Sequence, residues 1–200
     1  DDDNITATNG TITLTGEGNI TIGTLTATNN ATASAVSITS RTGALEDGTN
    51  AVAIVADTAG AGTTIRTATG VGVVDSLNTT IDTLDVVNSA ANNVTIEETA
   101  GSALTVNQAS QSTAGDINLT TLDGTLTVNA GQTGISVVGT GTVNLTATNA
   151  GGDDDVVVNS AITAETGVVT IDSQGNNVNF GAGGDVTTTT GNIVVTAAAG

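Results

Sequence analysis

Apolar and polar residues alternate in short segments along most of this chain. The clearest stretch contains four similar five-residue units, which are Gly167–Ile171, Asn176–Phe180, Gly184–Thr188 and Gly191–Val195. Each unit begins with Gly or Asn, and its third and fifth residues are mostly branched and apolar. A period of two over a few residues, bounded by Gly and Asn, is typical of a short strand with one buried face. The pattern therefore predicts a repeat of short β-strands separated by turns.

The same unit recurs from one end of the chain to the other. The further units are Gly10–Leu14, Gly18–Ile22, Gly23–Ala27, Ser34–Ile38, Asn50–Ile54, Asp82–Val86, Asn92–Ile96, Ser102–Val106, Gly115–Leu119, Gly124–Val128, Thr133–Val137, Gly141–Leu145 and Asp154–Val158. The pattern is looser over residues 41–90, where we expect a longer loop or a bend, and residues 63–74 show no clear period. No linker or change in composition interrupts the units, which predicts one continuous solenoid over residues 1–200, irregular around 41–90.

Two architectures use short strands at this spacing, namely tandem immunoglobulin-like sandwiches and a β-solenoid. A sandwich needs distinct strands with large core residues, whereas these units are nearly identical and contain one aromatic residue, Phe180. In a solenoid like residues stack coil on coil, so Val, Ile, Leu and Ala can fill the narrow interior. Because pairs of units recur near every twenty residues, we predict an all-β, parallel β-solenoid (β-helix) of about ten coils with roughly twenty residues each.

Individual positions follow from this architecture. Ile193 is expected to point into the interior, because it is the third residue of its unit. The Asn residues at unit starts, such as Asn92 and Asn176, are expected to adopt left-handed turn conformations or to stack in side-chain ladders between coils.

Disorder is the alternative that composition raises, because the chain has a net charge of −18 and almost no aromatic residues. Val, Ile, Leu and Phe nevertheless make up roughly a quarter of the chain, above the ~20% level of disordered sequences, and they alternate in register. Thr is abundant, and its branched Cβ favours strands over helices. The composition therefore supports a folded chain built from strands.

The charge balance excludes two classes of partner. Arg41 and Arg66 are the only cations, against twenty acidic residues. Nucleic acids and anionic lipids both attract basic surfaces, so we expect neither nucleic-acid binding nor attraction to a membrane surface. No apolar run approaches the ~18 residues needed to span a bilayer, so membrane insertion is not expected either. The absence of Cys excludes a disulfide scaffold and does not decide the compartment.

The chemistry-bearing residues do not point to an enzyme. The chain contains no His or Lys that could act as a general base or activate a hydroxyl. The carboxylate pairs Asp82/Asp85 and Glu97/Glu98 could in principle flank a glycosidic bond, but solvated charges on turns or outer faces explain them better. We therefore expect no catalytic residue and no enzymatic activity.

Calcium is the one metal ligand that the sequence suggests. Asp153, Asp154 and Asp155 follow a Gly-Gly turn directly before a strand, and oxygen ligands clustered at a turn suit Ca²⁺. Neither an EF-hand loop nor the glycine-rich calcium nonapeptide is present. Consecutive Asp residues on a strand would also point to alternating faces. A solvated acidic run is the alternative to a calcium site at these three residues.

Threonine rows suggest a second ligand. Thr-x-Thr recurs, for example at Thr11–Thr15, Thr24–Thr28 and Thr146–Thr148. Aligned Thr rows on a flat solenoid face could order water, as in ice-binding proteins. The motif is missing from most units between 41 and 120, and Thr is in any case a good outward strand residue.

The units Gly115–Leu119, Gly141–Thr148 and Gly191–Ala197 resemble the repeats of the filamentous-haemagglutinin-like β-helical adhesins, large secreted bacterial surface proteins with β-strand repeats. The resemblance covers most of the chain and is clearest after Asn92. It implies a right-handed parallel β-helix that is exported and acts in attachment, aggregation or biofilm. No residue corresponds to a known receptor-binding motif, so no site residue is carried over.

Pattern and resemblance together predict a structural protein. We expect a stiff, acidic rod, extracellular or on the cell surface, that belongs to a longer rod or an end-to-end filament, because uncapped solenoids expose strand edges that pair with other chains. The expected partners are further copies of the chain and a glycan or protein on a host or cell surface. The alternative is a ligand-binding β module that takes calcium or ice.

Overall fold

The computed structural model describes residues 4–48, 51–99, 101, 103–149, 152 and 154–198. These residues form short parallel strands and no helix. The strands are β1 (Asn4–Thr8), β2 (Ile12–Gly16), β3 (Ile20–Ile22), β4 (Thr24–Thr28), β5 (Val36–Ser40), β6 (Leu45–Asp47), β7 (Ile54–Ala56), β8 (Gly62–Thr67), β9 (Leu77–Ile81), β10 (Thr83–Asn88), β11 (Val94–Glu98), β12 (Leu104–Gln111), β13 (Ile117–Thr121), β14 (Leu126–Val128), β15 (Gly134–Val137), β16 (Val143–Ala147), β17 (Val156–Val158), β18 (Ile162–Ala164), β19 (Val169–Ser173), β20 (Val178–Phe180), β21 (Val186–Thr188) and β22 (Ile193–Ala197).

One column of aligned residues shows the length of a coil. This column contains one residue from each coil, in register with the next: Ile20, Leu45, Val71, Val94, Ile117, Val143, Val169 and Ile193. Successive members are 23 to 26 residues apart, so the chain forms about eight turns of ~24 residues. The predicted parallel β-solenoid is confirmed. Its coils are longer and fewer than the ten of roughly twenty residues expected, because one coil contains up to three strand units.

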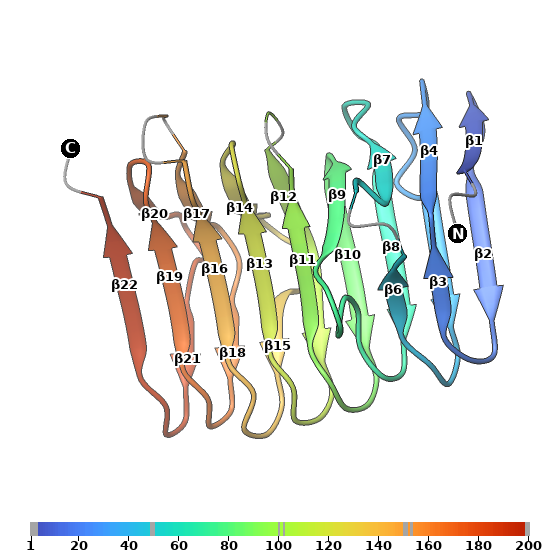
Figure 1. Ribbon diagram of the computed structural model, residues 1–200. Coiled ribbons are helices and arrows are strands. Elements are labelled where there is room, and N and C mark those ends of the chain that lie inside the picture. The colour runs from blue at the N-terminus through green and yellow to red at the C-terminus, as the bar shows by residue number, and fades with distance from the viewer. Residues whose placement is uncertain are drawn as a thin grey trace.

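The coils stack side by side along the molecule, from β1 and β2 at one end to β22 at the other (Figure 1). One sheet contains β1, β4, β7, β9, β11, β13, β16, β19 and β22 in that order. A second sheet contains β2, β5, β8, β10, β12, β14, β17 and β20, and β3 pairs with β6. Because every turn of the chain returns to the same sheets, paired strand residues lie beside their equivalents in the preceding coil.

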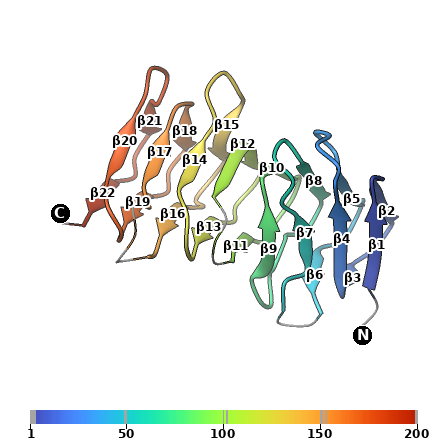
Figure 2. The same cartoon turned by 90° about the horizontal axis from the view of Figure 1, so that it is seen from above.

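The second sheet branches at β12, where the register shifts by one residue at Asn107. The first half of β12 pairs with β14, and its second half pairs with β15. The strands β15, β18 and β21 then continue as a separate row beside β14, β17 and β20 (Figure 2). A β-bulge bends a strand and increases its twist. After the bulge at Asn107, each later coil contributes two short strands to this sheet in place of one longer strand.

Val, Ile, Leu and Ala fill the interior, as the composition predicted. In β13 and β16 the inward residues Ile117, Leu119, Val143 and Leu145 have no solvent exposure, and the residues between them lie on the outer face. The buried residues form one cluster from Ile12 to Ile171. Phe180, by contrast, is 49% exposed in the last coil. Burial of branched aliphatic side chains in stacked rows is therefore the main apolar contribution to stability.

Asparagine side chains link the coils. Asn144 Nδ2 donates a hydrogen bond of 2.7 Å to Asn118 Oδ1, and Asn129 Nδ2 donates one of 2.7 Å to Asn107 Oδ1. Asn92 has a φ angle of 70°, which confirms its predicted left-handed turn, whereas Asn176 has no positive φ. The two Asn–Asn pairs lie within or after strands. At a unit start, Asn92 Nδ2 links coils by donating to the Thr69 carbonyl oxygen at 3.0 Å.

Ile193 shows that the contribution of a core residue to the free energy of unfolding depends on where its coil lies in the stack. It belongs to the inward column but is 45% exposed, because no described strand covers the last coil, whereas Val143 in the same column is fully buried. We expect Val143→Ala to lower the free energy of unfolding by about 2 kcal/mol. Ile193→Ala should lower it by less than about 1 kcal/mol, although it removes more atoms. Thermal unfolding of both variants checks the order, and a larger loss for Ile193→Ala would contradict the placement.

Candidate functional site

The aspartate run lies directly before β17. Asp153 lies outside the described residues. Asp155 Oδ1 accepts a hydrogen bond of 2.9 Å from the Asn177 N–H, and Asp155 Oδ2 accepts one of 2.8 Å from Asn179 Nδ2. This carboxylate therefore joins its coil to the next one.

Asp154 differs from its neighbour. Its side chain is buried, and its Oδ2 has no hydrogen-bond partner among the described residues. Within the part of the chain that the structure describes, no three His, Cys, Asp or Glu side chains gather closely enough to hold a metal ion. Calcium binding at Asp153, Asp154 and Asp155 stays a prediction.

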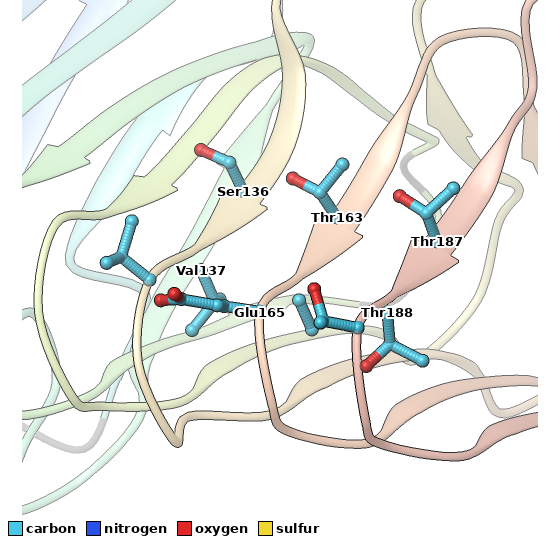
Figure 3. Close-up of a pocket in the computed structure, with 9 residues that line it drawn as sticks. Ser136, Val137, Thr163, Glu165, Thr187 and Thr188 are labelled. Atoms are coloured by element: carbon cyan, nitrogen blue, oxygen red, sulfur yellow. The ribbon is translucent and has the colours of Figure 1, made fainter.

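A groove of about 490 Å³ lies on the outer surface of β15, β18 and β21. We call it the outer groove; it is lined by Ser136, Val137, Val138, Thr163, Ala164, Glu165, Thr187, Thr188 and Thr189. Ser136, Thr163 and Thr187 are register partners, and their hydroxyl groups form one row across the three strands (Figure 3). Neighbouring strands lie ~4.8 Å apart, so the row presents hydroxyls at that spacing.

Two polar residues of the outer groove hold the turns of adjoining coils. Glu165 Oε2 accepts a hydrogen bond of 2.7 Å from the Gly139 N–H. Thr188 Oγ1 donates to the carbonyl oxygen of Gly167 at 3.1 Å and accepts from the Gly191 N–H at 3.0 Å. The groove therefore presents mainly neutral hydroxyls, which can exchange hydrogen bonds with water or with a polyhydroxylated ligand.

The hydroxyl row extends along the rod but is not continuous. In register order it contains Thr15, Thr39, Arg66, Val87, Ser110, Ser136, Thr163 and Thr187. Arg66 and Val87 interrupt it near the middle of the molecule. An unbroken lattice of Thr hydroxyls, the basis of the ice-binding hypothesis, is therefore not formed along this row.

The two carboxylate pairs singled out in the sequence are not brought together as pairs. Glu97 lies on the outer face of β11, whereas Glu98 points inward. Asp82 Oδ2 accepts a hydrogen bond from the Gly60 N–H, whereas Asp85 forms an ion pair with Arg66. Each carboxylate thus has a separate environment.

Glu98 is the most unusual ionisable group of the described chain. It is fully buried at the end of β11, between Thr79 and Thr121 of the neighbouring strands. Its Oε2 accepts a hydrogen bond of 2.7 Å from Thr79 Oγ1, and its Oε1 accepts one of 2.9 Å from the Ile81 N–H. Burial raises the pKa of Glu98 to about 7, although both hydrogen bonds lower it, and the negative charge of Asp57 raises it further.

Both end faces of the rod expose apolar residues. At the N-terminal end, a hollow of about 270 Å³ is lined by Ile5, Leu14, Ile20, Thr21, Ile22, Gly23 and Leu25. At the C-terminal end, Phe180, Ile193, Val194 and Val195 are 45–49% exposed. Among the described strands, β1, β2 and β3 at one end and β20, β21 and β22 at the other each have a neighbour on one side only. Strand edges of this kind can pair with a further coil.

No protein-family model, no curated protein and no solved structure matches this chain. The fold is therefore established by the structure alone, and the resemblance of the repeat units does not identify a family. No described segment forms a helix that is long and apolar enough to cross a membrane.

Sequence reasoning missed the outer groove and the unusual state of Glu98. The groove depends on how far β15, β18 and β21 turn away from the rest of the sheet, which alternation does not encode. Alternation along Val94, Ile96 and Glu98 does place Glu98 on the inner face. That signal was available in the sequence, and it conflicts with the general rule that unpaired carboxylates lie outside.

Proposed function

We propose that this chain is a segment of a structural extracellular fibre or adhesin, in which the β-solenoid is a stiff rod for cell-surface attachment, aggregation or biofilm. The strongest support is the pair of apolar end faces. Their apolar residues continue the columns of buried residues in the core, as Ile193 and Val195 of β22 do for Val169 and Ile171 of β19. Further coils, from the same polypeptide or from another copy, would cover these faces and continue the rod.

Three other features agree with a mechanical role. Backbone hydrogen bonds join successive coils, as between Val143 and Val168 or Val169 and Asn192. Side-chain bonds between coils, such as the Asn118–Asn144 pair, add to them. The net charge of −18 keeps such a rod soluble. The adhesin role and the extracellular location rest on the resemblance of the repeat units.

Electron microscopy of the purified chain, with and without a calcium chelator, tests the proposal. We expect uniform filaments that survive chelation, because stacked strand edges need no metal. Isolated short particles would contradict end-to-end assembly, and filaments that dissolve in the chelator would favour a calcium-dependent module at Asp153, Asp154 and Asp155.

Two neighbouring substitutions in β22 show whether the end face mediates assembly. Val195 is in register with the buried Ile171, whereas Thr196 is in register with Asp172 on the outer face. We expect Val195→Lys to abolish filaments, because it places a charge under the next coil, and Thr196→Lys to leave them intact. Equal filament formation by both variants would argue against stacking through this face.

A further inference from the structure

The two cations of this acidic chain line one groove. Arg41 follows β5 directly, and Arg66 lies on β8, the neighbouring strand in the same sheet. We define the arginine groove by its lining residues, which are Thr39, Ser40, Arg41, Arg66, Thr67, Val87 and Ser89, and its volume is about 230 Å³. Both cationic side chains of a chain with twenty acidic residues thus line a single surface hollow.

Arg66 is the fixed member of the pair. Its Nη2 forms an ion pair of 2.9 Å with Asp85 Oδ1, and its Nη1 donates hydrogen bonds of 3.0 Å to the carbonyl oxygens of Ile65 and Asp85. The side chain is about one-third exposed. These contacts hold the guanidinium in one orientation before any ligand arrives, which reduces the entropy lost on binding.

Arg41 is the available member. Its Nη1 contacts Glu17 Oε1, and the side chains of Arg41 and Glu17 are 60% and 72% exposed. Exposed ion pairs of this kind contribute little to stability, so a ligand can displace Glu17. A guanidinium has five N–H donors, and the contact with Glu17 engages one of them.

We propose that the arginine groove binds the carboxylate of a small sugar acid. A guanidinium group matches a carboxylate through two parallel hydrogen bonds. Arg41, once released from Glu17, can bind in this way, and Arg66 adds a second positive charge to the lining. The surrounding negative charge disfavours polyanions and dianions more than it disfavours a single carboxylate. The Thr39 hydroxyl in the lining offers a partner for the hydroxyls of a sugar ring. The Ser89 hydroxyl donates to the Thr67 carbonyl oxygen and can still accept a hydrogen bond.

The size of the groove limits the ligand. Sites for drug-sized molecules typically have volumes of ~300–1,000 Å³, and this groove is smaller. It therefore has room for about one sugar residue of a ligand. In the rod proposed above, the groove would supply the contact with an acidic glycan terminus, but it can be tested on the chain by itself, whether or not the chain assembles.

Nuclear magnetic resonance gives a direct readout, because the chain has two arginines and therefore two Nε–Hε signals. Glucuronate is titrated at constant ionic strength, with glucose as the uncharged control and acetate as the carboxylate without a sugar. We expect both signals to shift along one saturating curve with glucuronate, and no shift with glucose. If acetate binds more weakly than glucuronate, the sugar ring contributes part of the affinity. Equal affinity for the two would overturn the sugar-acid assignment.

Single substitutions assign the effect to the groove. Arg41→Gln should weaken glucuronate binding by at least about tenfold, because it removes a charge-assisted contact. Glu17→Gln should strengthen binding several-fold by releasing Arg41. The control is Asp172→Asn, which also removes one negative charge, but from the outer face of a distant strand, β19. Linear shifts without saturation, or equal effects of Glu17→Gln and Asp172→Asn, would overturn the proposal, and unchanged melting of each variant confirms that it is folded.

Discussion

Replacing Gly167 by alanine is expected to destabilise the solenoid by about 3–5 kcal/mol, although it adds one methyl group. A Cβ atom on Gly167 would lie 1.8 Å from the carbonyl oxygen of Gly141 and 2.6 Å from its carbonyl carbon. Both atoms belong to the backbone of the preceding coil, which cannot rotate away as a side chain can. The coils would therefore have to separate at this point, and the hydrogen bonds between them would lengthen.

The same close approach recurs from coil to coil. A Cβ atom on Gly141 would lie 2.0 Å from the carbonyl oxygen of Gly115, and one on Gly191 would lie 1.8 Å from that of Gly167. The glycines thus form a column two residues before the apolar column of Ile117, Val143, Val169 and Ile193. Glycine is required at Gly141, Gly167 and Gly191 by the distance between coils and not by a left-handed backbone.

Gly18→Ala is the matched control, because a Cβ atom on Gly18 would have no neighbour within 4 Å. Thermal unfolding followed by circular dichroism should show a midpoint about 10 °C or more lower for Gly167→Ala, and a nearly unchanged midpoint for Gly18→Ala. Similar midpoints for the two variants would show that the coils are not packed as tightly as the structure indicates.

These glycines also show how far the sequence could predict the fold. The units that begin with Gly115, Gly141, Gly167 and Gly191 become β13, β16, β19 and β22, which are successive rungs of one sheet. Alternation identified these strands and their inward residues correctly. It did not show that the units Asn176–Phe180 and Gly184–Thr188 belong to other faces of the same coil, because near-identical units do not reveal which face they occupy. The coil length was therefore underestimated.

One strand that the sequence did not reveal, β8, has polar residues in the core. Residues 63–74 showed no clear period, yet β8 (Gly62–Thr67) is a regular strand whose inward residues are Thr63, Ile65 and Thr67. Thr63 lies in one column with Val36 and Leu84, where its methyl group takes the place of an aliphatic side chain. An inward Thr looks like an outward Thr in the sequence, so alternation alone could not identify β8.

Sites were harder to predict than strands, because they depend on which coils meet. Arg41 and Arg66 are 25 positions apart, close to one coil length. Only the true coil length places β5, which Arg41 follows, beside β8, which contains Arg66. With coils of about twenty residues, the two arginines would have been assigned to different faces. The sequence therefore could not predict the arginine groove, because the groove depends on the coil length.

The stability of the solenoid is expected to fall by about 3 kcal/mol as the pH rises from about 4.5 to about 7, through Glu98 alone. Burial raises the pKa of Glu98 from 4.5 to about 7 in the folded chain. Below pH 4.5 the carboxyl is protonated in both the folded and the unfolded state. Between the two pKa values the folded state holds a proton that the unfolded state has lost, so each rise in pH favours unfolding. Above pH 7 the loss is complete, because the folded state is then ionised as well.

The neighbouring residue provides the control for this prediction. The other acidic residues also repel one another more strongly as the pH rises, so the wild-type curve contains more than the effect of Glu98. Glu97→Gln removes one negative charge from the outer face of β11, and Glu98→Gln removes one from the interior. The difference between these two variants isolates the cost of burying the charge.

Glu98→Gln should stabilise the chain at pH 8 by about 3 kcal/mol relative to Glu97→Gln, and the two should have similar stability near pH 4. The glutamine amide oxygen can still accept the Ile81 N–H, and its amide nitrogen can donate to Thr79 Oγ1, so the variant resembles the protonated acid. Denaturant unfolding at several pH values measures the difference. If the difference in free energy of unfolding between the two variants does not depend on pH, the Glu98 carboxyl reaches solvent. A carboxylate that is charged in water has no cost of burial, so replacing it would give no pH-dependent gain in stability.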